Sequence, residues 1–307
     1  MLGLILHKVL LGLLTILIAI ILAGFLIHLI PGDPVTALAA PGLSSSPLVM
    51  AEMRSRLGLD LPVWQQVGLY VWNVLNGDFG RTIRGNEPVL GVLLSRLPNT
   101  FMLATAGLSV ALLVGIPLGI FSAVRRGTVA DAVVTIVLII GASIPAFWTG
   151  LILLHVFSLK LGWLPVAGTG WRNLVLPALT LGLAYCALVS RATRSALVEV
   201  LGEDYIRTAR ARGLREHQVL LIHALRPALI NIITVAGLIF AYLLGGQVVV
   251  ENVYAWNGVG RLAVQAILAR DYPMVQGFIV VFATAIVIIS TILDVLYALL
   301  DPRIRQS

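Results

Sequence analysis

Long apolar runs separated by short polar segments dominate the chain. The first extends from Val9 to Ile30, and five more follow, at about Asn99 to Val124, Ala132 to Phe157, Leu174 to Ser190, Ala228 to Val250 and Met274 to Leu299. A helix needs about 20 such residues to cross a bilayer. The runs do not alternate with polar residues, so they predict helices, which satisfy their own backbone hydrogen bonds in lipid. We therefore expect an all-α, polytopic membrane protein with six transmembrane helices.

The first apolar run is expected to stay in the protein as a membrane span. It is longer than the apolar region of a usual signal peptide, and a sharp Pro31-Gly32-Asp33-Pro34 turn follows it in place of an Ala-x-Ala cleavage site. The predicted organisation is an N-terminus with the first helix over 1–30, a long external loop over 31–98, and a five-helix core over 99–307 that contains a polar segment at 191–227.

Both long polar segments contain predicted helices. In the loop 31–98, residues Val63 to Leu75 read as an amphipathic helix with Trp64 and Trp72, and such rings suit an interface where one side is wet. In the segment 191–227, the stretch from Glu199 to Ala224 contains no proline and only Gly202 and Gly213 as helix breakers.

Composition and charge agree with a membrane protein. Apolar residues make up 59% of the 307 residues, charged residues only 11%, and the mean hydropathy is +1.00. The net charge of +7 comes from basic residues between the apolar runs, which favours membrane orientation over nucleic-acid binding. Twelve lie on the side that holds both termini, against four in the short opposite loops, so we expect cytoplasmic termini. The twelve are Lys8, Arg125, Arg126, Arg191, Arg194, Arg207, Arg210, Arg212, Arg215, Arg226, Arg303 and Arg305.

The sequence offers little catalytic chemistry. No G-x-x-x-x-G-K-[ST] phosphate loop occurs, so ATP hydrolysis by that route is excluded for this chain. Cys186 is the single cysteine, and the five histidines lack metal-ligand spacing. We therefore predict no catalytic residue, no metal site and no cofactor on this polypeptide.

Two other classes of function fit the sequence less well. A membrane protease built on Ser143, Ser190 and His155 would need a nucleophile-elbow spacing that the sequence lacks. An ion-coupled secondary carrier would need several buried ionisable groups, whereas Asp294 is the one acid clearly inside a predicted span. The carrier stays as the alternative from another class.

Prolines, glycines and large rings mark a candidate gate on the translocation path. The segment from Gly141 to Trp148 joins small residues, which let helices approach, to a proline that frees a backbone carbonyl. Ordinary helix packing is the competing explanation. The residues assigned to this path are Ser143, Pro145, Phe147, Trp148, Gly245 and Gly246.

The polar segment also contains a short helix suited to docking on another protein. At helical spacing Ile206, Ala209 and Gly213 form a small apolar stripe, with Arg207 and Arg210 beside it. Acids at its start suit the helix dipole. The residues assigned to docking are Glu203, Asp204, Tyr205, Ile206, Arg207, Ala209, Arg210, Ala211 and Gly213.

This segment, followed by Leu-Leu-Ile-His-Ala-Leu-Arg-Pro at 220–227, resembles the cytoplasmic coupling motif of ABC importer permease subunits of the dipeptide/oligopeptide/nickel, binding-protein-dependent family. Further marks lie in order along the chain: Leu-Ile-Pro-Gly-Asp-Pro at 29–34, Gly-Asp-Phe-Gly at 77–80, Ser-Ile-Pro-Ala-Phe-Trp at 143–148, Val-Glu-Asn-Val-Tyr-Ala-Trp at 250–256 and Asp-Pro-Arg-Ile-Arg at 301–305. Asn257 departs from the family's usual proline before Gly258.

The resemblance implies a type I importer permease fold in the bacterial inner membrane, with the loop 31–98 in the periplasm. The implied partners are a second homologous permease, two ATP-binding subunits that carry ATP and Mg, and a periplasmic or lipid-anchored solute-binding protein. The docking helix would sit in an ATP-binding subunit. The implied cargo is a di- or oligopeptide, with nickel or glutathione as alternatives.

Overall fold

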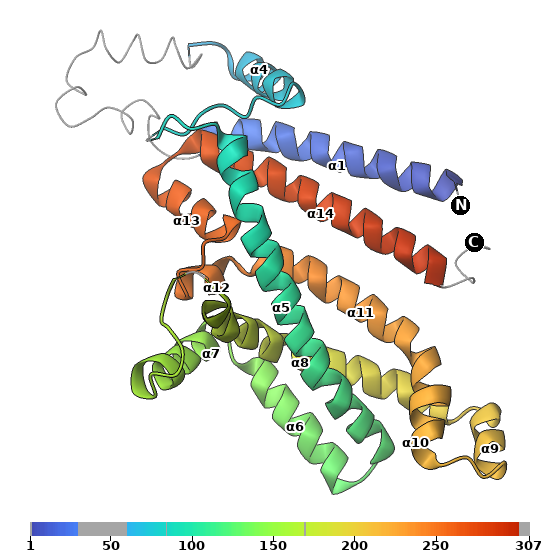
Figure 1. Ribbon diagram of the computed structural model, residues 1–307. Coiled ribbons are helices and arrows are strands. Elements are labelled where there is room, and N and C mark those ends of the chain that lie inside the picture. Colours follow the sequence, from blue (N-terminus) through green and yellow to red (C-terminus); the bar gives the residue numbers. More distant parts are fainter. Residues whose placement is uncertain (1, 30–59, 84, 169, 301–307) are drawn as a thin grey trace. The chain divides into compact units, whose positions relative to one another are not determined.

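A computed structural model describes residues 2–29, 60–83, 85–168 and 170–300, and the regular structure in these ranges is helical (Figure 1). The chain divides into two compact units. One comprises Met1–Pro98 and Gly258–Ile292, and the other comprises Asn99–Asn257 and Leu293–Ser307. Residues 30–59, which begin the predicted loop 31–98, and the Asp-Pro-Arg-Ile-Arg segment at 301–305 lie outside the described residues.

The first unit is built on two long helices that lie side by side, α1 (Leu2–Leu29) and α14 (Tyr272–Leu300) (Figure 1). A Cβ built on Gly12 of α1 would stand 2.7 Å from Val287 Cγ1 of α14, so the glycine permits close approach. The Gln276 side chain of α14 also donates a hydrogen bond to the Ala23 carbonyl oxygen of α1, at 3.0 Å. Both contacts hold the two helices together.

A shorter helix, α4 (Val63–Leu75), packs across the end of α1 and occupies the stretch predicted as amphipathic. Its Val74 joins a small core with Ile20 and Ala23 of α1 and Val280 of α14. Trp64 and Trp72 are 73% and 67% exposed. The helix α13 (Val259–Ala269) and the start of α5 (Val89–Val124) complete this unit through a core around Val89, Leu93 and Val259.

The second unit is arranged around α8 (Trp171–Leu201), which packs against neighbouring helices on several sides. Close contact with α5 is possible because glycines lie between the two helices. A Cβ built on Gly107 would stand 2.9 Å from Leu181, and one on Gly119 would stand 2.6 Å from Thr193. Small residues at these positions let the two helix backbones approach closely. The other partners of α8 are α6 (Val129–Ser143), α7 (Ala146–Leu153), α11 (Leu225–Gly246) and α12 (Val248–Val253).

Among the residues that the structure describes, five helices are long and apolar enough to cross a membrane, and a sixth span results if the bent pair α6 and α7 with η1 (Leu154–Lys160) counts as one. The prediction of an all-helical, multi-span protein is confirmed. The third span is not the continuous helix expected over 132–157, since it bends by 94° between Ser143 and Ala146. Pro145 has no N–H to donate, and it holds Ile144 in extended backbone, at φ −82° and ψ 126°.

Candidate functional site

The predicted docking helix exists as α9 (Asp204–Ala211), and the two glycines foreseen as breakers mark its ends. Gly202 follows the last residue of α8, and Gly213 has a φ of +78°, a backbone conformation that favours glycine. Asp204 lies in the first turn and Arg210 in the last, as the helix dipole favours. After a turn, the chain continues through α10 (Glu216–Gln218) and the π-helix η2 (Val219–Ala224) into α11.

The apolar stripe of α9 faces its own protein. Ile206 is fully buried and Ala209 is 7% exposed. Both lie in a core cluster with Ala123 of α5, Ala196 and Leu197 of α8, Val219 and Ala224 of η2, and Ala228 of α11. The expectation that Ile206, Ala209 and Gly213 together face a partner is therefore corrected: the first two are covered by the chain itself, and Gly213 lies beyond the helix end.

The opposite face of α9 is exposed and charged. Tyr205 is 45% exposed, and the Arg207 and Asp204 side chains are 75% and 93% exposed at a separation of 3.4 Å. Arg210 forms two bonds to the Glu216 carboxylate, at 2.7 and 3.2 Å, and this contact raises the pKa of the Arg210 guanidinium. Glu203, Ala211 and Gly213 are exposed as well. This face is the part of α9 that another protein can reach.

The predicted gate residues of the third span lie at its bend. Pro145 precedes α7 directly, and the Ser143 hydroxyl donates to the Ile139 carbonyl oxygen at 2.8 Å. Phe147 and Trp148 are 43% and 53% exposed. The other two, Gly245 and Gly246, end α11, and α12 follows one residue later and packs on α7. The burial of Gly246 lies outside what the structure describes.

A buried hydrogen-bond network secures α7 next to this bend. The Tyr254 hydroxyl, just after α12, donates to the Gly150 carbonyl oxygen of α7 at 2.9 Å and lies 2.8 Å from the Thr180 hydroxyl of α8. Tyr254 is 4% exposed, so each of these polar groups needs its partner inside the protein. The network fixes α7 relative to α8 and α12.

An ion pair between a buried carboxylate and a half-buried guanidinium was not foreseen. Asp131, in the first turn of α6, is 5% exposed and accepts two bonds from Arg194 of α8, at 2.9 and 2.7 Å. It also accepts from the Ser122 hydroxyl and from the Gly127 backbone N–H at 3.1 Å. Sequence reasoning missed the pair because Asp131 was placed just outside a span. The available signal was Thr128, whose side chain caps the helix three residues before Asp131.

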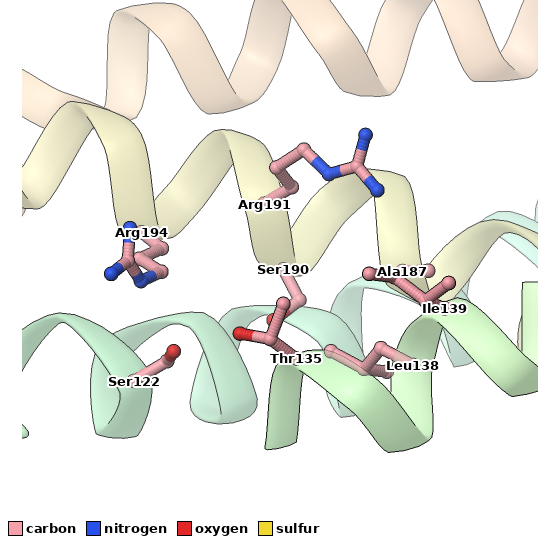
Figure 2. Close-up of a pocket in the computed structure, with 8 residues that line it drawn as sticks. All are labelled: Ser122, Thr135, Leu138, Ile139, Ala187, Ser190, Arg191 and Arg194. Carbon is pink, nitrogen blue, oxygen red and sulfur yellow. The ribbon is translucent and has the colours of Figure 1, made fainter. Parts of the chain in front are cut away.

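A cavity of about 290 Å³ adjoins this ion pair, between α6 and α8 (Figure 2). The walls combine hydroxyl and apolar side chains: Ser122, Thr135, Leu138, Ile139, Ala187, Ser190, Arg191 and Arg194. Figure 2 shows Arg194 on the side of Ser122, whereas the guanidinium of Arg191 is directed away from Thr135 and Ser190. Within the described ranges, no group of three or more His, Cys, Asp and Glu residues is placed to hold a metal ion.

Comparison with known families gives two matches that together extend over almost the whole sequence. Residues 115–306 match the family described as binding-protein-dependent transport system inner membrane component. Residues 1–104 match the N-terminal family of the same type of membrane component.

Several curated proteins are similar over nearly the full length. The glutathione transport system permease protein GsiC of Salmonella choleraesuis (strain SC-B67) is 43% identical over 302 residues, which is 98% of both chains. GsiC of Escherichia coli (strain K12) is 41% identical over the same share of each.

Solved structures of the MetNI methionine ABC transporter in inward-facing conformations have a similar fold. One covers 69% of this chain and 97% of its own, with a TM-score of 0.56 and 20% identity. A second crystal form covers 70% and 99%, with a TM-score of 0.60 and 19% identity. At such identities the likeness concerns the fold, which is that of a type I ABC importer permease.

Proposed function

Because the chain belongs to the family of binding-protein-dependent transport system inner membrane components, and is thus a permease subunit of an ABC importer, we propose that its cargo is glutathione. The observation that carries this proposal is the identity of 41–43% to glutathione permeases over 98% of both chains. Glutathione is one of the two alternatives to the di- or oligopeptide cargo that the family resemblance implied. Nickel gains no support from the relatives.

A permease of this family is a multi-pass inner-membrane protein that works with ATPase subunits and a solute-binding protein. We propose the fuller assembly: a second, homologous permease and two ATPase subunits, with ATP and Mg held by those subunits and no cofactor on this chain. The lack of a phosphate-loop sequence supports this division of labour. The concentration of arginines around α9 supports cytoplasmic termini and a cytoplasmic position for α9.

The exposed face of α9 is the proposed contact with an ATPase subunit. Tyr205 and Arg207 lie on this face, while Ile206 and Ala209 fasten the helix to its own unit. Closure of the ATPase subunits on ATP would move α9 together with the helix ends in its core. ATP then needs only to favour the outward-open state over the inward-open one.

The exposed rings of α4 are the proposed contact for the solute-binding protein. Trp64 and Trp72 are largely exposed, whereas Val74 packs in a core with α1. Aromatic residues are enriched in the cores of protein interfaces. The double substitution Trp64→Ala/Trp72→Ala should lower uptake with binding protein at limiting concentration. Unchanged uptake under that condition would reject the contact.

Transport by the whole complex tests the central proposal. The permease pair, the ATPase subunits and the binding protein are reconstituted in liposomes and offered labelled glutathione, an unrelated dipeptide or Ni²⁺. We expect ATP-dependent accumulation of glutathione. Accumulation of the dipeptide or of Ni²⁺ without glutathione would reject the cargo, and uptake by this chain without ATPase subunits would favour the ion-coupled carrier.

A further inference from the structure

Asp131 gathers three segments of the second unit at one carboxylate. Its bonds come from Arg194 of α8, from Ser122 near the end of α5, and from the backbone N–H of Gly127 in the turn between α5 and α6. The Arg194 contact is bidentate, which fixes the relative orientation of the two groups as well as their distance. The start of α6 is thereby tied to α5 and α8.

The same two helix ends carry α9. Ala123 of α5 follows Ser122 directly, and Ala196 and Leu197 of α8 lie two and three residues after Arg194. All three lie in one core cluster with Ile206 and Ala209. A displacement of α9 is therefore transmitted to the segments that hold Asp131.

Beside the ion pair, the contact between α6 and α8 opens into a groove. This space of about 290 Å³ is lined by Thr135, Leu138 and Ile139 of α6 and by Ala187 and Ser190 of α8, and the Ile139 side chain is 47% exposed. Close packing transmits displacement between helices, and side chains that face each other across a groove lack those contacts. The polar bonds of Asp131 add a directional link to the packing of α6 on α8.

From this geometry we infer that Asp131 and Arg194 are positioning residues of the transport cycle, through which displacement of α9 reaches α6 and the bend at Pro145. The inference rests on the proposed docking of α9 against an ATPase subunit. From Asp131, α6 continues to Ser143, after which the chain turns by 94° into α7 with its exposed Phe147 and Trp148. The ion pair would be the point at which movement of α8 is passed to α6.

An ion pair of this kind is weak evidence for stability, whereas its two-bond geometry fixes the relative orientation of the two groups, and this difference gives the test. Asp131→Asn and Arg194→Gln each leave one partner without its counter-charge. The double variant removes both charges, while the introduced asparagine side chain keeps an oxygen that can accept from Ser122 and Gly127. We therefore expect the double variant to assemble better than either single one.

The decisive measurement is the number of glutathione molecules imported per ATP hydrolysed by the reconstituted complex. We expect the double variant to hydrolyse ATP with that ratio at least tenfold lower. Arg194→Lys, which keeps the charge but loses the two-bond geometry, should give an intermediate ratio and decides the matter where the double variant does not assemble. A purely structural pair would leave the ratio at the wild-type value in both, and that result would overturn the inference.

Arg191→Gln is the matched control, because it removes the same charge one turn earlier on α8 from a side chain that borders the same cavity but whose guanidinium points away from Thr135 and Ser190 (Figure 2). Its ratio should equal that of the wild type. Cross-linking from Tyr205→Cys to an ATPase subunit separates the two hypotheses. A missing cross-link in the otherwise wild-type complex would overturn the docking proposal and this inference with it. A normal cross-link with a wild-type ratio in the double variant would overturn the inference alone.

Discussion

Gly115 of α5 lies directly against Val189 of α8, since a Cβ built on the glycine would stand 2.7 Å from the valine Cβ and 2.8 Å from the Cys186 carbonyl oxygen. The second atom is backbone, which cannot rotate out of the way. The helices that form the centre of the second unit are therefore as close as this position allows.

Gly115→Leu should disrupt that contact. Overpacking of a tight interior costs about 1–3 kcal/mol, so we expect a lower apparent Tm and less assembled complex in membranes. The matched control is Gly141→Ala in α6, where nothing lies within 4 Å of the added Cβ. Alanine in place of glycine within a helix is worth about 0.5–1 kcal/mol, so this variant should unfold at the wild-type temperature or slightly above it. Equal Tm values for both variants would contradict the packing argument.

Gly213 is needed for its backbone conformation. Its φ of +78° is disfavoured for other residues, while the added Cβ would meet nothing within 4 Å. A left-handed conformation costs a residue with a side chain about 1–2 kcal/mol, and asparagine tolerates it best. We expect Gly213→Val to reduce uptake and the stimulation of ATP hydrolysis, and Gly213→Asn to keep most of both.

The comparison separates this role from one in close docking. If Gly213 were needed only because it lacks a side chain, asparagine at this position would lower activity as much as valine does. Equal losses in the two variants would therefore support close docking at Gly213 and contradict the conformational account. Wild-type activity in Gly213→Val would contradict both.

Tyr254→Phe should loosen α7. The change removes the hydroxyl that donates to the buried Gly150 carbonyl oxygen at 2.9 Å and leaves that oxygen with the Leu154 backbone N–H as a donor. A hydrogen bond contributes about 0.5–1.5 kcal/mol, so we expect a measurable fall in the apparent Tm of the purified complex. Tyr242→Phe removes the same atom from a ring that is 57% exposed and should leave Tm unchanged.

Cysteine labelling should reveal which face of α9 is open. The chain's one cysteine, Cys186, is buried and should react slowly, so the otherwise wild-type chain serves as the unlabelled reference. In membranes that lack the ATPase subunits, Tyr205→Cys and Arg207→Cys should react quickly with a membrane-impermeant maleimide added from the cytoplasmic side, and Ile206→Cys should react slowly. Addition of ATPase subunits should then protect position 205. Fast reaction at 206 would show that the core around α9 is wrongly assigned.

Apolar patterning was enough to place the helices, because lipid imposes one requirement on every span: continuous apolar length. Two features went beyond it. The first ten residues of α5, Val89–Pro98, read as loop because Arg96 and Pro98 interrupt the run, yet Val89 and Leu93 are buried in the core that they share with Val259. The bend at Pro145 was foreseen as a flexible element, but its angle depends on how α6 and α7 pack on α8.

The direction of the α9 stripe and the partner of Asp131 depend on contacts between distant parts of the chain. Helical spacing located Ile206 and Ala209 on one face but could not say whether that face meets the chain itself or another protein. Asp131 and Arg194 are 63 residues apart, and both lie at the ends of apolar runs where a charge is ordinary. A single sequence gives the identity of both residues but not the contact between them.

The division of α9 into a face that meets its own subunit and a face open to others has a consequence for engineering. In the proposed docking, the exposed residues meet the ATPase subunit, and the buried residues support assembly of this subunit. Recognition of the ATPase can therefore be altered separately from assembly. A chimaera can carry the exposed α9 residues of another transporter and retain Ile206 and Ala209. It should insert normally and couple to the ATPase of that other transporter.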